Sequence, residues 1–209
     1  MNFYRTAISA FIFVLVGCLI GSVAQAQTGL ALGYSARSIE VLRANHVAPD
    51  QPFNFSFGAF TTIRISSNVA FRPGVAFSQI STEYRDLSSH LDGSLAVVRS
   101  LEVSGEYLEF PLLFEFQREF GSAFKVVAGP AFGFLTSSEF NQDGWQEEGW
   151  ATGSEIGAVL GLGYSTGLGK SAVGVDLLFR QPMTKFGNKS TYIGEAKVGG
   201  FSIVGHVSL

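Results

Sequence analysis

The sequence predicts an all-β protein: a closed, antiparallel, up-and-down transmembrane β-barrel of about eight strands that follows a cleaved signal peptide. Three observations carry this expectation. The first residues have the form of an export signal. Along most of the remaining chain, apolar residues alternate with other residues. The connections between these alternating segments are short and long in alternation.

Composition supports a membrane or large-core protein. The chain has 209 residues, of which 46% are hydrophobic and only 15% are charged, whereas soluble domains average roughly 25% charged residues. It also contains 25 glycines and 20 phenylalanines. The formal net charge of −3 gives no support for nucleic-acid binding.

The N-terminus predicts a signal peptide. Arg5 precedes an apolar run at residues 7–20, and small residues follow at Ala24 and Ala26. We therefore expect residues 1–26 to be removed by cleavage after Ala26 and residues 27–209 to form one barrel domain. An uncleaved anchor is the alternative, but the apolar run is short for a span of about 20 residues.

Cys18 offers a second interpretation of the same segment. Residues 15–18 match a lipobox, in which Cys18 would be acylated, but the apolar run continues past it. Cleavage after Ala26 is the preferred prediction, and it leaves a mature chain without cysteine and therefore without disulfides.

The mature chain alternates with a period of two, which indicates strands with one apolar face. No later stretch approaches 18 consecutive apolar residues, so a helical bundle is not expected. The alternating segments are residues 29–37, 53–65, 69–79, 107–118, 124–135, 156–164, 173–181 and 197–209.

The connections between these segments follow a rule of their own. Short turns are expected at residues 66–68, 119–122 and 166–170, and long polar loops at residues 43–52, 85–100, 137–150 and 182–196. Outer-membrane barrels have short periplasmic turns and longer extracellular loops. The order is correct throughout if the N-terminus is periplasmic.

One face of nearly every segment is free of charge, and the other carries it. An eight-stranded barrel has an interior that side chains fill, so we place the charged face inside as a structural network of ion pairs. A selective pore or proton path is the functional alternative. The predicted network consists of Arg37, Arg64, Arg72, Glu109, Glu115, Lys125, Glu155, Asp176 and Arg180.

Three stretches resemble the PorT-type outer-membrane β-barrel family. They are EYLEFPLLF at residues 106–114, FKVVAGPAFGFL at residues 124–135 and GAVLGLGYSTGLGKSAVGVDLLF at residues 157–179. The resemblance implies an eight-stranded barrel with a signal peptide in the outer membrane, and its founding member is associated with type IX secretion. It supplies no catalytic motif, so neither an enzyme activity nor a cofactor is expected.

The expected partners follow from this placement. They are outer-membrane lipid, the barrel-assembly machinery during biogenesis, and an envelope protein that contacts the long outer loops. A structural or interaction role is therefore the first hypothesis, and a small transport pore is the second.

Two further alternatives stay open at this stage. A soluble lipocalin-like barrel would place the apolar face inside, and alternation alone does not exclude it. An enzyme of the outer leaflet could use His206 and Ser208, although both belong to the expected inward face. Asp143, Glu147 and Glu148 could hold a cation in an outer loop, but their spacing matches no calcium loop.

The membrane prediction has a direct test. A closed membrane barrel stays compact in detergent until it is boiled, so the protein should be in the outer-membrane fraction and change its gel mobility on heating. A soluble periplasmic protein with unchanged mobility would contradict the prediction.

Overall fold

The computed structural model describes residues 26–41, 54–89, 95–118, 123–142, 145–149, 151–168, 171–188 and 196–209. Within these residues eight strands form a barrel and two short strands lie at its rim. The barrel strands are β1 (Ala26–Val41), β2 (Asn54–Arg64), β3 (Val69–Ser89), β4 (Leu95–Gln117), β5 (Phe124–Gln142), β7 (Ala151–Leu168), β8 (Ser171–Pro182) and β10 (Ala196–Ser208). The rim strands are β6 (Trp145–Glu148) and β9 (Gly187–Asn188).

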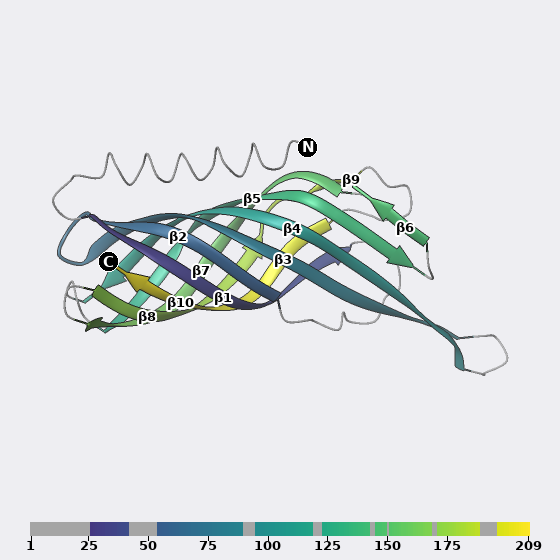
Figure 1. Ribbon diagram of the computed structural model, residues 1–209, viewed down its shortest axis with the longest axis horizontal. Helices are drawn as coiled ribbons and strands as arrows, with labels where there is room; N and C mark the ends of the chain where they lie inside the picture. The colour runs from purple at the N-terminus through teal and green to yellow at the C-terminus, as the bar shows by residue number, and fades with distance from the viewer. Residues whose placement is uncertain are drawn as a thin grey trace.

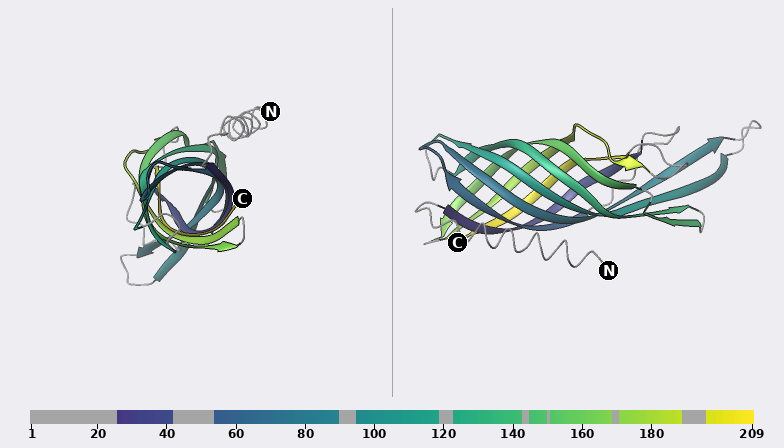
Figure 2. Two further views of the ribbon diagram at one scale, coloured as in Figure 1. Left: turned by 90° about the vertical axis from the view of Figure 1, so that its left-hand side faces the viewer. Right: turned by 90° about the horizontal axis from the view of Figure 1, so that it is seen from above.

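The eight barrel strands close into a ring, which Figure 2 shows end-on (left view). Each pairs antiparallel with its neighbours along the chain, β5 pairs with β7, and β1 pairs with β10 from Gly29↔Ser208 to Val41↔Ala196. The ring satisfies the backbone hydrogen bonds without leaving a sheet edge in the wall, as a membrane-spanning sheet requires. The predicted fold class is confirmed.

The two faces of the wall have opposite character. Outward side chains are apolar and exposed: Leu32 is 73% and Phe124 is 76% exposed, whereas inward Asp176 and Arg180 are each 1% exposed. A soluble lipid carrier would have apolar residues inside and polar residues outside. The lipocalin-like alternative is therefore wrong, because the apolar face is the one that lipid can solvate.

Two of the predicted outer loops are largely strand. β3 has 21 residues and β4 has 23, whereas about 9–11 tilted residues cross a bilayer. They stay paired well into the predicted loop, from Val69↔Phe116 to Ser89↔Leu95, with a register shift between Leu87 and Ser89. The prediction of a loop there was wrong because it relied on alternation of apolar and other residues. A strand beyond the membrane is surrounded by water, needs no apolar face and therefore need not alternate.

The same correction applies to residues 137–150. β5 continues to Gln142, and β6 pairs back onto it from Glu139↔Glu148 to Gln142↔Trp145. In Figure 1 the β3–β4 hairpin and the β5–β6 hairpin both project from the end of the barrel opposite the C-terminus. The turn at residues 66–68 lies at the end that carries the C-terminus, and so do the strand ends Gln117↔Lys125 and Leu168↔Ser171 that flank the other two predicted turns, as the connection rule predicts.

The segment after β8 folds back over the outer rim. The N–H groups of Met183 and Thr184 donate to the carbonyl of Ile156, and the Ile156 N–H donates to the Thr184 hydroxyl at 2.7 Å. This turn directs Phe186 into the mouth of the barrel, where it is only 2% exposed.

Several predicted features lie outside the described residues. They are the signal segment at residues 1–25 with Cys18, the loop at residues 43–52, the turn at residues 119–122, and parts of the segments at residues 85–100, 137–150, 166–170 and 182–196. No helix in the described part of the chain is long and apolar enough to cross a membrane.

Inward glycines make room for large inward side chains, and this predicts where substitution is costly. A Cβ on Gly133 would collide with the ring and hydroxyl of Tyr107, which is fully buried. Gly133→Ala should therefore lower the free energy of unfolding by about 1–3 kcal/mol, measured as loss of the compact gel band with urea. Gly205→Ala is the control, since a Cβ there meets no atom closer than 3.8 Å. Equal stability of the two variants would contradict this account.

Candidate functional site

The barrel interior holds most of the charged side chains that the sequence places on inward faces. Nearer the outer end lies a group that we call the outer cluster: Arg37, Glu109, Glu155 and Arg180. Glu109 accepts from both arginines, at 3.1 Å from Arg37 Nη1 and 2.7 Å from Arg180 Nε. Arg180 also contacts Glu155 through Nη1 at 2.9 Å. Two cations and two carboxylates from β1, β4, β7 and β8 thus neutralise one another.

Tyr107 completes the outer cluster. Its hydroxyl donates to Glu155 Oε1 at 2.7 Å, and its ring lies 5.4 Å below the Arg180 guanidinium carbon. The other oxygen of Glu155 accepts from the backbone N–H of Val198 at 3.2 Å. Glu155 is therefore held by three donors from three other strands, as a buried carboxylate requires.

Nearer the periplasmic end lies the second group, the periplasmic cluster: Arg72, Glu115, Lys125 and Asp176, with His206 beside them. Arg72 Nη1 is 2.8 Å from Glu115 and 2.7 Å from Asp176. Lys125 Nζ is 2.8 Å from Glu115 and 3.4 Å from Asp176. Each carboxylate is shared by both cations, so this cluster is neutral as well.

Apolar layers separate and cover the two clusters. Between them pack Leu113, Val127, Ala131, Val159 and Leu178, with Val204 against them. Above the outer cluster, toward the outside, lie the buried residues Ile39, Ile80, Val103, Phe186 and Val198. The order of side chains along β8 reproduces the layering: Asp176 in the periplasmic cluster, Leu178 in the apolar layer, Arg180 in the outer cluster.

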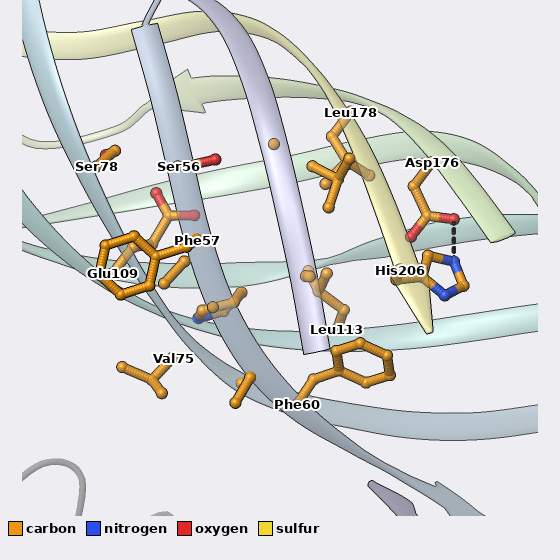
Figure 3. A pocket seen from close by; sticks show the side chains of 18 of the residues that line it. Ser56, Phe57, Phe60, Val75, Ser78, Glu109, Leu113, Asp176, Leu178 and His206 are labelled. Carbon is orange, nitrogen blue, oxygen red and sulfur yellow. Dashed lines mark ion pairs between the residues drawn. The ribbon is translucent and has the colours of Figure 1, made fainter. Parts of the chain in front are cut away.

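A cavity lies between the clusters, and Figure 3 shows its lining. Its volume is about 80 Å³, and both Glu109 of the outer cluster and Asp176 of the periplasmic cluster face it. A water molecule needs roughly 10–15 Å³ of such space, so the cavity has room for a few waters. It is bounded on the side of β1–β3 by small residues, among them Gly33, Ser56 and Gly74.

Eight of the nine residues predicted for the interior lie in the two clusters, and one lies elsewhere. Arg64 is the last residue of β2, and its side chain is exposed rather than buried. The alternation placed it on the correct face, but the strand ends there, at the periplasmic rim.

Three functional residues of the interior escaped the sequence prediction of the network. Tyr107 and His206 carry the inward parity of β4 and β10, so their positions followed from the alternation, whereas their roles in the charge clusters did not. Phe186 gave no signal at all, because it lies in a segment expected to be a loop and enters the mouth only through the turn at Met183–Thr184.

The candidates for chemistry are placed as follows. His206 and Ser208 are both buried on the inward face, and His206 Nε2 contacts Asp176 at 3.4 Å, so neither side chain is on the outer surface. Asp143 lies outside the described residues, and so does the side chain of Glu147, while Glu148 is exposed. Among the described residues, no group of three potential ligands could hold a metal ion.

An apolar outer wall, a closed ring of antiparallel strands and a neutral, filled interior together define an integral outer-membrane β-barrel. Residues 23–188 match the family described as the outer membrane protein β-barrel domain, and the chain belongs to that family. Its place is accordingly the outer membrane.

Three solved structures are similar to this chain over most of its length. Ail, the attachment invasion locus protein of Yersinia pestis, is 12% identical with a TM-score of 0.43, over 88% of this chain and 99% of that one. OprG of Pseudomonas aeruginosa is 12% identical with a TM-score of 0.42, over 88% and 93%. The transport unit of the autotransporter AIDA-I from Escherichia coli is 7% identical with a TM-score of 0.37, over 90% of each chain. No match was found among curated proteins.

The sharing of carboxylates predicts how the interior responds to mutation. Arg180→Met leaves Glu109 and Glu155 with one remaining cation, and removal of one partner from a buried ion pair costs about 3–5 kcal/mol. The urea midpoint of the compact band should fall accordingly. Adding Glu155→Gln restores neutrality and keeps an acceptor for Tyr107, so the double variant should recover part of the loss. Additive losses would show that the two side chains do not interact energetically.

Proposed function

We propose that this barrel is a structural or interaction protein that anchors an outer platform in the membrane and presents it to another envelope protein. The observation that carries the proposal is the filled interior. Two neutral ion-pair clusters and two apolar layers occupy the lumen and leave a cavity of about 80 Å³. A wall this well filled is a rigid support for whatever its outer end displays.

The same observation argues against the transport alternative. A conducting path would have to pass the side chains of Leu113, Val159 and Leu178 and then the outer layer around Ile39 and Val103, all of which are buried. It would also have to separate carboxylates from cations at 2.7–3.1 Å. Breaking such buried pairs is energetically costly.

The outer platform is the extension of β3 and β4 within residues 83–102, which has no role in spanning the membrane. β3 and β4 pair beyond the lipid-facing rung Phe77↔Leu108 up to Ser89↔Leu95. On the outward face of this extension, Glu83 lies directly opposite Glu102. On the neighbouring β5–β6 hairpin, Glu139 lies directly opposite Glu148. Like charges in directly opposed positions weaken a sheet, so this face is not optimised for the stability of the barrel alone. A surface of this kind suits a partner.

The resemblance of residues 106–114, 124–135 and 157–179 to the PorT type indicates where to search for that partner. The type IX secretion machinery is the first candidate, and other envelope complexes are the second. The expected contacts with outer-membrane lipid and, during biogenesis, with the barrel-assembly machinery are common to barrels that insert in this membrane and do not distinguish among these roles.

The first test is conductance. Purified, heat-modifiable protein reconstituted in a planar bilayer should give no steady current above that of the empty bilayer. Discrete, reproducible conductance steps from folded protein would favour the transport alternative and overturn the proposal of a sealed barrel.

The second test removes the platform and leaves the barrel. Replacing residues 83–102 by Asn-Gly joins the pair Thr82↔Val103 through a two-residue hairpin turn. The variant should keep its heat-dependent mobility and lose the crosslinked envelope protein seen with the full chain. The control replaces residues 139–148 by Asn-Gly, closed by the hydrogen bond from Gly149 N–H to Ser138 O at 2.7 Å.

Identification of the crosslinked protein by mass spectrometry completes this test. A secretion or envelope component that depends on residues 83–102 supports the proposal. Crosslinks confined to assembly factors, or unaffected by the loss of residues 83–102, would contradict it.

A further inference from the structure

Gly205 differs from most other glycines of the barrel wall. It lies on the outward face of β10 and is exposed between Ile203 and Val207. A Cβ added to most inward glycines would collide with a neighbouring atom. A Cβ added to Gly205 would have as its nearest neighbour the carbonyl oxygen of Leu32, at 3.8 Å. Its φ is not positive either. Neither packing nor backbone geometry therefore demands glycine at this position.

Glycine in the interior of a strand weakens it, and it often marks a site where a ligand approaches the backbone closely. Gly205 lies in the floor of an open groove of about 540 Å³ in the outer wall. This volume lies within the range of about 300–1,000 Å³ that is typical of small-molecule sites. The groove is lined chiefly by apolar side chains: Leu30, Leu32, Val173, Val207 and Leu209.

The groove is a fixed feature of the wall. Leu32 pairs with Gly205, and Leu30 pairs with Val207, which pairs with Val173 on the other side. Hydrogen-bonded ladders thus join β1, β10 and β8 beneath the groove, so the strands cannot move together to close it. An unfilled groove would deprive its lining of dispersion contacts. A molecule from outside the chain must therefore fill it.

The position of the groove decides the chemistry of that molecule. Leu209 is the last residue of the chain, and its N–H donates to the carbonyl of Thr28 at 2.8 Å. This is the end of the barrel with the short turns, the periplasmic end. The flanking side chains belong to the lipid-facing surface, with Leu32 and Leu209 each 73% exposed.

We infer that the groove over Gly205 binds one acyl chain of a phospholipid in the periplasmic leaflet of the outer membrane. The chain lies along β10 between Leu30 and Leu32 of β1 on one side and Val173 of β8 on the other, in contact with the backbone at Gly205. This site depends on the membrane placement of the barrel and is independent of the proposed interaction role.

The test is photo-crosslinking with a defined lipid. The barrel is placed in nanodiscs that contain a small fraction of phosphatidylethanolamine with a diazirine at the end of one acyl chain. After irradiation, adducts are mapped by mass spectrometry. Peptides that contain Leu30–Leu32 and Val207–Leu209 should carry several-fold more adduct than peptides from the rest of the lipid-facing wall.

Substitution at the floor of the groove distinguishes a site from ordinary lipid contact. Gly205→Leu fills the groove and should reduce these adducts to the level of the rest of the wall. The matched control is Ala158→Leu on β7, which places the same leucine side chain at another exposed, outward position and should leave the adducts unchanged. If Gly205→Leu does not fold, Val207→Phe covers the groove from the next outward position of the strand and should have the same effect.

Two results would overturn the inference. Adducts spread evenly around the wall, or unaffected by both groove variants in folded protein, would show annular lipid without a site. A crosslinked dimer in the nanodisc that Gly205→Leu abolishes would show that a second copy of the chain occupies the groove.

Discussion

The pairing of charge inside the barrel is the constraint on which the rest of the structure depends. Four arginine or lysine side chains and four carboxylates lie in a lumen that sits at membrane depth, and each cluster is neutral by itself. An unpaired charge in such a place would be costly. Because Glu109 joins two arginines and Asp176 contacts Arg72, Lys125 and His206, the pairs also connect strands that are not neighbours in the sheet. The clusters therefore connect non-adjacent strands through the interior of the barrel.

The ion pairs of the two clusters fix the register of the strands. A slip by one residue would turn Asp176 and Arg180 toward lipid and bring Leu177 and Phe179 inside, since successive side chains of a strand point to opposite faces. The apolar layer around Leu113 and Val127 imposes the same register by shape. Charge and packing thus specify one arrangement together, and the result is a filled lumen rather than an open one.

A filled lumen places the sites of contact with other molecules on the outside of the barrel. The lipid-facing band is one such surface, with its groove over Gly205. The outer hairpins are another: there β3 and β4 continue as a two-stranded arm well past the length that the bilayer needs. Phe186 is buried in the mouth after the turn at Met183–Thr184, so the described part of the outer end presents strands and a packed rim.

The sequence by itself determined the membrane-spanning part of this protein. Period-two alternation identified the eight strands and their inward faces, because a wall with lipid on one side and a packed lumen on the other imposes opposite residue types on successive positions. It also placed Arg37, Glu109, Asp176 and Arg180 inside. Only the tertiary structure decided which face is exposed as apolar surface, and thereby excluded the lipocalin-like arrangement, since alternation is the same whichever face is turned inward. The structure alone also decided the partners within each cluster, the exposed end position of Arg64, the entry of Phe186 into the mouth and the strands in the predicted outer loops. These features depend on strand register and on pairing between distant segments, and beyond the membrane no lipid imposes a pattern from which they could be read.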